Sequence, residues 1–286
     1  MTVVDAHHHV WDLSTRDQDW IAPDSPLRRN FTMADLAPEA AAAGVGHTVL
    51  VQTVTVPEET PEFLALAAGH ELIAGVVGWT DLTRPDVADE LARLLELPGG
   101  SHLKGIRHQV QGEPDPDWLL RPDVHRGLAA VADAGLVYDL VVLPHQLPVC
   151  VKAAGSLPHL TFVLDHLGKP PIASQGLEPW ATDVRALAAL PNTVCKLSGM
   201  VTEADLASWT PDDLRPYADT VLDAFGPDRL LFGSDWPVCR LAATYAQVVE
   251  TASELTGPLS SHERAAVFGD NAIRTYGLEV RPTTAA

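Results

Sequence analysis

Three consecutive histidines lie near the start of the chain, in the stretch VVDAHHHVW. Side chains of a regular strand alternate between its two faces, so we expect Asp5, His7 and His9 on one face. His8 is expected on the opposite face, where it packs. Two imidazoles on one face can bind the same divalent ion, because neutral imidazole is a good ligand for zinc. The spacing predicts a metal or substrate site at the end of a first strand.

Two further residues of this kind follow apolar runs later in the chain, His166 in VLDHLG and Asp235 in LLFGSDWP. With His7 and His9 they supply three imidazoles and one carboxylate, a set that suits zinc with one position open. Such an ion lowers the pKa of bound water and polarises a carbonyl group. Asp235 can take the proton of that water and return it to a leaving oxygen. We predict all four as metal ligands, with Asp235 and His166 also catalytic.

Each of these residues taken alone has a structural alternative. His166 can be a core histidine bonded to a backbone carbonyl, because one partner satisfies a buried polar group. Asp235 can be a turn residue, a common position for aspartate. The prediction of a site rests on their joint placement at strand ends.

The predicted substrate-binding residues are Arg107 and His108, in HLKGIRHQ, and the tryptophans Trp79 and Trp236. The guanidinium of Arg107 can hold a carboxylate, a sugar hydroxyl or a developing oxyanion. Its alternative is an ion pair with a surface acid. The two indoles can form flat apolar walls for a ring-shaped ligand, or they can belong to the core.

Short β-rich runs alternate with Ala/Leu-rich helical segments along the whole chain. The candidate strands are residues 2–7, 47–52, 72–79, 102–109, 136–142, 160–166, 193–199 and 229–235. The helical segments include residues 33–44, 84–99, 121–135, 178–191 and 212–226. Eight such repeats in 286 residues predict an α/β fold, a single (β/α)8 TIM barrel.

The main alternative fold is an open doubly wound sheet. It would carry a glycine-rich phosphate loop after its first strand, where this chain has HHHVW. We expect one barrel over residues 1–278 and a C-terminal tail over 279–286. Residues 25–30 and 111–118 are expected as long loops over the mouth of the barrel, where the carboxyl ends of the strands present functional groups.

Composition limits the partners. Nineteen basic and 38 acidic residues give a formal charge of −19, which disfavours nucleic acid. The three cysteines are widely spaced, so we expect no disulfide framework, no thiolate zinc cage and a reducing compartment. No apolar stretch is long enough to span a membrane. We expect a cytoplasmic protein with a small-molecule substrate, no nucleic-acid or membrane partner, and possible homo-oligomers.

Several longer motifs resemble the lactonase branch of the amidohydrolase superfamily (amidohydrolase 2 type), and within it the hydrolases of L-fuconolactone and L-rhamnonolactone. They are DAHHHVWD, GIRHQVQGEPDPDW, DHLGKP, CKLSGM, LLFGSDWPVC and FGDNAIRTYGL. The resemblance runs from residue 3 to about 278. It implies a (β/α)8 barrel with His7, His9 and His166 in the site, Asp235 as base, and Arg107 with His108 near the substrate.

One departure from the wider superfamily concerns the metal. No lysine or glutamate ends the fourth candidate strand to bridge two ions, since Lys104 lies earlier and Arg107 and His108 occupy the end. This disfavours a binuclear centre. We expect one divalent ion, with zinc as the best fit. Metal-independent action, which the resemblance also allows, would leave the histidines to hydrogen-bond the carbonyl oxygen.

The leading functional hypothesis is a hydrolase that opens the ring ester of a small sugar-derived lactone by attack of water. Ester opening needs an activated water, a stabilised carbonyl oxygen and a proton for the leaving alkoxide. The alternatives are a non-oxidative decarboxylase of a small aromatic acid, a metal-dependent nuclease, and a non-catalytic barrel that binds a metal or a sugar.

Overall fold

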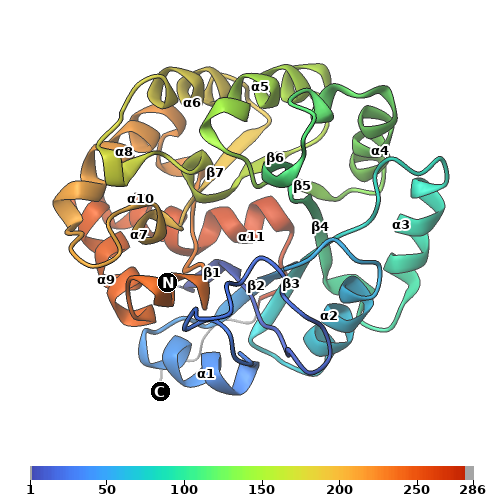
Figure 1. Ribbon diagram of the computed structural model, residues 1–286, viewed down its shortest axis with the longest axis horizontal. Coiled ribbons are helices and arrows are strands. Elements are labelled where there is room, and N and C mark those ends of the chain that lie inside the picture. Colours follow the sequence, from blue (N-terminus) through green and yellow to red (C-terminus); the bar gives the residue numbers. More distant parts are fainter. Residues whose placement is uncertain (1, 281–286) are drawn as a thin grey trace.

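The computed structural model describes residues 2–280 and contains one sheet of eight parallel strands, each paired with the next along the chain. The helices form a ring around these strands (Figure 1). The strands are β1 (Val4–His8), β2 (His47–Val51), β3 (Ile73–Gly78), β4 (Leu103–His108), β5 (Val137–Leu140), β6 (Phe162–Leu164), β7 (Thr193–Leu197) and β8 (Leu230–Phe232). The prediction of a single (β/α)8 barrel is confirmed. Seven predicted strands contain the observed one, and β1 extends one residue beyond the predicted range 2–7.

Eleven α-helices lie within the described residues. They are α1 (Met33–Ala42), α2 (Glu59–Ala68), α3 (Val87–Glu96), α4 (Pro122–Asp133), α5 (Leu147–Ser156), α6 (Trp180–Ala188), α7 (Met200–Glu203), α8 (Pro211–Phe225), α9 (Tyr245–Leu255), α10 (Ser261–Ala265) and α11 (Asn271–Tyr276). The five predicted helical segments correspond to α1, α3, α4, α6 and α8. The periodicity of α3 is the clearest, because Val87, Leu91 and Leu94 form its buried stripe. None of these helices is both long and apolar enough to cross a membrane.

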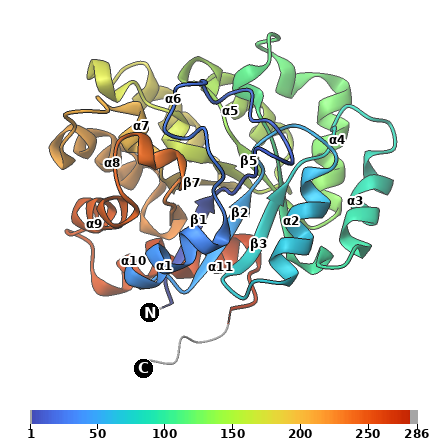
Figure 2. The same cartoon turned by 60° about the horizontal axis from the view of Figure 1, so that its bottom comes forward.

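Two separate apolar cores hold the barrel together. The larger lies between the strands and the surrounding helices, and the smaller fills the lumen with side chains such as Val49, Val77 and Leu231. Helix α11 adds Tyr276 to the lumen core. It lies across the end of the barrel near the amino ends of the strands, while the segment after β1 runs over the opposite end (Figure 2). The site is therefore confined to the mouth formed by the carboxyl ends.

The first strand is irregular, and this changes the expected orientation of Asp5. Pairing of β1 with β2 shifts between Asp5 and His8, so that one extra residue of β1 is accommodated as a bulge. The carboxylate of Asp5 accepts a hydrogen bond from the hydroxyl of Tyr245 on α9, at 3.0 Å. Asp5 thus faces the helical layer. The prediction that it shares a face with His7 and His9 is wrong, because it assumed regular alternation.

The barrel closes along a seam between β1 and the segment that follows β8. The backbone N–H of His9 donates to the carbonyl of Trp236 at 2.7 Å, and that of Asp235 donates to the carbonyl of His7 at 2.8 Å. These two bonds place residues from opposite ends of the sequence side by side.

The expected loop over residues 25–30 belongs to a longer irregular segment between β1 and α1. Residues 111–118 form irregular backbone with short 3-10 turns. The expected tail begins at Glu279. Its residues 281–286 lie outside the described part of the chain.

Gly269, in the π-helical turn Ala266–Asp270, packs closely against the backbone of Thr2, just before β1. A Cβ at this position would lie 2.0 Å from the backbone oxygen of Thr2. We expect Gly269→Ala to lower the free energy of unfolding by roughly 1–3 kcal/mol, because the backbone must shift to relieve the clash. Thermal denaturation should show a loss of several degrees.

Gly155 in α5 provides the matched control, since a Cβ there meets no atom within 4 Å. Gly155→Ala should leave the midpoint unchanged or raise it, because alanine restricts the unfolded chain and favours helix. Equal midpoints for both variants would contradict the role given to Gly269.

Candidate functional site

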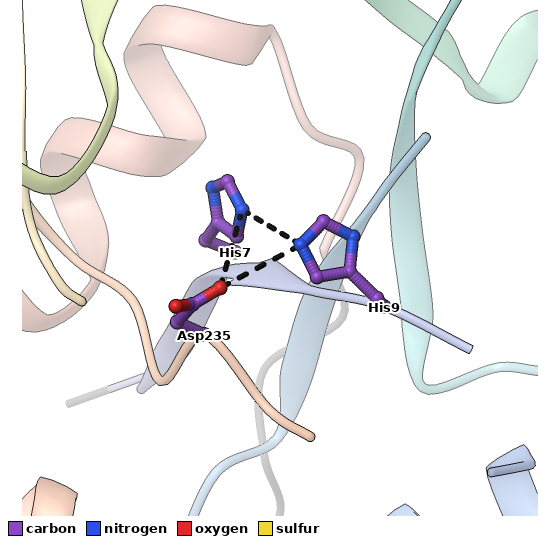
Figure 3. Close-up of side chains that lie close together, drawn as sticks. All are labelled: His7, His9 and Asp235. Atoms are coloured by element: carbon purple, nitrogen blue, oxygen red, sulfur yellow. Dashed lines mark hydrogen bonds and ion pairs between the residues drawn. The ribbon is translucent and has the colours of Figure 1, made fainter. Parts of the chain in front are cut away.

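Three of the predicted ligands form a compact triangle at the mouth of the barrel (Figure 3). His7 Nε2 lies 3.1 Å from His9 Nε2 and 3.7 Å from Asp235 Oδ1. His9 Nε2 lies 3.6 Å from the same carboxylate oxygen. All three residues are buried. The strand bulge and the seam together bring these atoms to one point.

The size and chemistry of this triangle fit a divalent metal ion. Ligands at about 2.1 Å from a tetrahedral zinc ion are about 3.4 Å apart from one another, and the three observed separations bracket that distance. His9 Nδ1 donates to the carbonyl of Val51 at 2.7 Å, because a carbonyl can only accept. The neutral ring of His9 therefore keeps a lone pair on Nε2, which faces the triangle, as a metal ligand requires.

His166 lies beside this triangle. Its Nε2 is 3.8 Å from Asp235 Oδ1, and its Nδ1 is 2.9 Å from the hydroxyl of Ser198. Its ring centroid is 4.4 Å from that of His7. The structure thus brings all four predicted ligands together, with His166 on the wall next to the three closest donors.

A second possible set of ligand atoms comes from His7, Asp165 and His166. Two cations already neutralise Asp165 there: Lys196 Nζ lies 2.9 Å from Oδ1, and Arg107 Nη1 lies 2.9 Å from Oδ2. A divalent ion would compete with both, so this set is a poor metal site. The geometry favours one metal position, in agreement with the expected departure from a binuclear centre.

Lys196 is the main residue of the site that sequence reasoning missed. It is fully buried in β7, where its Nζ lies 2.6 Å from Asp139 Oδ2 and 3.0 Å from His7 Nδ1. The signal was present in the sequence, because a lysine inside the apolar run TVCKLSG must find a buried acidic partner. Lys196 limits rotation of the His7 ring by its contact with Nδ1 on the lumen side of the site.

The two acids bonded to Lys196 respond differently to burial. Burial raises the pKa of Asp139 to about 6, although Lys196 opposes that shift. Burial acts the same way on Asp165, but Lys196, His7 and Arg107 outweigh it and hold the pKa of Asp165 well below its usual range. Asp165 is therefore the stable anion of this network.

Arg107 lies at the cavity, as predicted for a substrate contact, and it is also bonded to protein groups. Its Nε and Nη2 bond to Gln52, and its Nη1 bonds to Asp165 and lies 3.3 Å from His7 Nε2. Although Arg107 contributes to the wall of the cavity, every guanidinium nitrogen has a protein partner. Neither a surface ion pair nor a free oxyanion donor describes it. It positions Asp165 and His7.

The structure does not bring His108, Trp79 and Trp236 to the cavity. His108 stacks on Trp118 with centroids 4.2 Å apart, and its Nδ1 accepts a hydrogen bond from Trp79 Nε1 at 2.9 Å. Trp236 is fully buried and packs edge-on against Phe31. The predicted substrate contacts of these three residues lack geometric support, because their rings pack against other aromatic rings or bond to protein groups outside the cavity lining.

A cavity of about 130 Å³ opens beside the triangle. Its aromatic wall comes from Trp20, whose exposure of 42% is high for a tryptophan. Trp20 was not predicted, because the expected loop over the mouth was placed at residues 25–30 and did not include it. The lining residues are His9, Trp20, Thr53, Arg107, Gln109, Gln111, Val141, His166, Lys169, Asp235 and Val238.

The protonation states in the site suit proton transfer from water. Burial alone would raise the pKa of Asp235, but His166, His9 and Lys169 outweigh it and keep this pKa below its usual range. Burial lowers the pKa of His166 to about 4, and Asp235 only partly opposes this. At neutral pH the site therefore holds an ionised Asp235 beside a neutral His166.

His8 is buried on the far side of β1, and neither of its ring nitrogens has a hydrogen-bond partner. Burial lowers its pKa to about 3, and His9 adds to the shift. Because an unfolded histidine binds a proton below about pH 6.5, the folded chain binds fewer protons between pH 6.5 and 3. His8 therefore contributes a decrease in the free energy of unfolding as the pH falls through that window.

We expect His8→Leu to reduce this loss by up to roughly 1.4 kcal/mol per pH unit, because the variant removes one such histidine. Urea denaturation of the chelator-treated protein at pH 7, 6 and 5 measures the difference. Equal pH slopes for wild type and variant would contradict the assignment, whatever their absolute stabilities.

A family model described as amidohydrolase matches residues 4–278. An L-fucono-1,5-lactonase of Burkholderia multivorans is 40% identical over 96% of this chain and 96% of its own length. An L-fucono-1,5-lactonase of Burkholderia ambifaria is 38% identical over 98% of this chain and 97% of its own length.

A crystal structure of an amidohydrolase from Burkholderia multivorans with bound zinc superimposes with a TM-score of 0.92 at 39% identity. The match covers 98% of this chain and 100% of that one. The similarity therefore extends over the whole barrel, including both ends of the sequence that form the seam.

Proposed function

The chain belongs to the amidohydrolase family, and we propose that it is a lactonase that opens the ring ester of a small sugar-derived lactone. The two relatives of 38% and 40% identity carry the name L-fucono-1,5-lactonase, so an L-fucono-1,5-lactone-like compound is the substrate we infer. The observation that carries the proposal is the ionised Asp235 among three imidazoles, beside a cavity of about 130 Å³.

Asp235 is the proposed general base. Its carboxylate is buried at the cavity wall, and its backbone adopts a left-handed conformation with φ of 56°. The hydrogen bond from its N–H to the carbonyl of His7 holds this conformation. A water beside the carboxylate can lose a proton to Asp235 as its oxygen attacks the lactone carbonyl carbon. Asp235 can then return the proton to the ring oxygen as the ester bond breaks.

His7, His9 and Asp235 are the residues that would hold the metal ion, with His166 beside them, and we propose zinc. When bound, such an ion lowers the pKa of water and polarises a carbonyl group. His9 presents its lone pair because Val51 fixes its tautomer. Nδ1 of His7 lies 3.3 Å from Asp165 Oδ1 and can donate to that carboxylate, which leaves the lone pair of His7 on Nε2. His166 is neutral and can donate from Nε2 to a substrate oxygen.

Trp20 is the proposed platform for the sugar ring. It is the exposed aromatic group of the cavity, and flat indoles suit the apolar face of a ring. The three cysteines are free and buried, which is compatible with the cytoplasm as the proposed location. The oligomeric state stays a prediction.

Asp235→Asn tests the base directly. We expect kcat for L-fucono-1,5-lactone to fall roughly 10²–10⁴-fold, because an amide cannot accept the proton of water. A pH-indicator assay measures acid release, with CO2 release followed in parallel on aromatic acids. Near-wild-type lactone hydrolysis by the variant would refute the role of Asp235. CO2 release by the wild type would favour the decarboxylase, and binding without turnover would favour a non-catalytic barrel.

Metal content tests the ligand set separately from turnover. Elemental analysis of the purified wild type should find about one zinc per chain, since the structure favours a single position. We expect His9→Ala to lose most of that zinc, because it removes one of the three closest donors. Full zinc content in the variant would place the metal elsewhere.

A further inference from the structure

Lys169 is a cation of the cavity that the proposed mechanism leaves unused. It contributes to the cavity wall together with His166 and Asp235. The other cation on that wall, Arg107, has a protein partner at each of its three guanidinium nitrogens. Lys169 is therefore the cation left on this wall to face a carbonyl oxygen that gains negative charge, beside the neutral donor His166.

An unusual left-handed turn of the backbone positions Lys169. Four consecutive residues after β6 have left-handed φ angles: 52° at His166, 56° at Leu167, 70° at Gly168 and 54° at Lys169. Each non-glycine residue in this conformation costs free energy, and runs of them are rare. Hydrogen bonds offset the cost, since Lys169 N–H donates to the carbonyl of His166 at 2.8 Å and Trp180 Nε1 donates to that of Leu167 at 2.8 Å.

This left-handed turn has a geometric consequence. It reverses the chain so tightly that residues three apart, His166 and Lys169, both reach the same cavity. An extended segment would direct residues three apart to opposite faces. Such strain commonly persists where it serves a site.

The ammonium group of Lys169 remains able to bind a ligand. Its ion-pair partner is Glu203 on α7, with Nζ and Oε1 3.7 Å apart, which is longer than a hydrogen bond. The side chain is 23% exposed, unlike that of Lys196, which is enclosed by Asp139 and Asp165. An ammonium has three N–H donors, so Lys169 can serve a ligand without losing Glu203.

We propose that Lys169 is a further catalytic residue, whose Nζ binds the lactone carbonyl oxygen and stabilises the negative charge that develops there. The proposal rests on the lactonase function. The water oxygen bonds to the carbonyl carbon while Asp235 takes its proton, and the carbonyl oxygen becomes an oxyanion beside Lys169. The ring C–O bond then breaks, and the ring oxygen takes the proton from Asp235. The acid formed loses its proton to solvent, which leaves a carboxylate facing Lys169.

Lys169→Met and Lys169→Arg test the proposal. Both keep a non-glycine residue at the left-handed position, and methionine removes the charge while preserving much of the length. We expect kcat/KM for L-fucono-1,5-lactone to fall roughly 10²–10³-fold in Lys169→Met, mainly through kcat, as when an oxyanion donor is removed. Lys169→Arg should recover part of the loss. Calorimetry should show weaker binding of the product, L-fuconate, to Lys169→Met.

Lys152→Met is the matched control, because Lys152 lies exposed on α5 and should behave as wild type. Thermal denaturation of each variant separates a loss of folding from a loss of chemistry, and the partly exposed Lys169 should leave the midpoint nearly unchanged.

The possible outcomes separate this proposal from the lactonase function. If the wild type opens the lactone and Lys169→Met does so equally well, the role of Lys169 is refuted and the lactonase function stands. If the wild type opens no lactone but binds L-fuconate in a Lys169-dependent way, the lactonase function fails and an anion contact at Lys169 is supported. A wild type that neither opens the lactone nor binds L-fuconate overturns both.

Discussion

The seam between β1 and the segment after β8 is the constraint on which the site depends. Asp5 strengthens it: its carboxylate accepts hydrogen bonds from the N–H and hydroxyl of Ser234, at 2.7 and 2.6 Å, and from the N–H of His7 at 3.1 Å. One buried carboxylate thus ties the residue before Asp235 to His7. Burial raises the pKa of Asp5 to about 6, although these bonds oppose the shift. The general base and the metal ligands are held together by closure of the barrel.

Beneath the site, the lumen contains charged side chains where an ordinary barrel has apolar ones. Lys196, Asp139, Asp165 and Arg107 are all buried, and burying charges costs free energy that their attraction only partly recovers. What the arrangement provides is orientation, because Lys196 and Arg107 contact both nitrogens of His7. A ligand whose ring cannot rotate needs no reordering when a metal or substrate binds.

Backbone strain is concentrated at the mouth of the barrel. Within the described residues, the non-glycine positions with positive φ are His166, Leu167, Lys169, Gln175 and Asp235. Three of these five contribute side chains to the cavity. Regular strand ends would aim side chains either into the lumen or toward the helices. The left-handed turns instead direct a histidine, a lysine and a carboxylate toward one small volume, and the surrounding hydrogen bonds keep them there.

The sequence by itself determined the barrel and the three residues of the triangle. Alternating apolar runs identified eight strands, because burial imposes period 2 on strands and 3.6 on helices, and His7, His9 and Asp235 followed from their places at strand ends. Only the tertiary structure decided the outward turn of Asp5, the pairing of Lys196, the engagement of Arg107, the packing of Trp236 and the approach of Trp20 and Lys169 to the cavity. The physical reason is that a bulge, a left-handed turn or a buried ion pair depends on neighbours far away in the chain. The hydrophobic periodicity of a strand depends only on the residues of that strand.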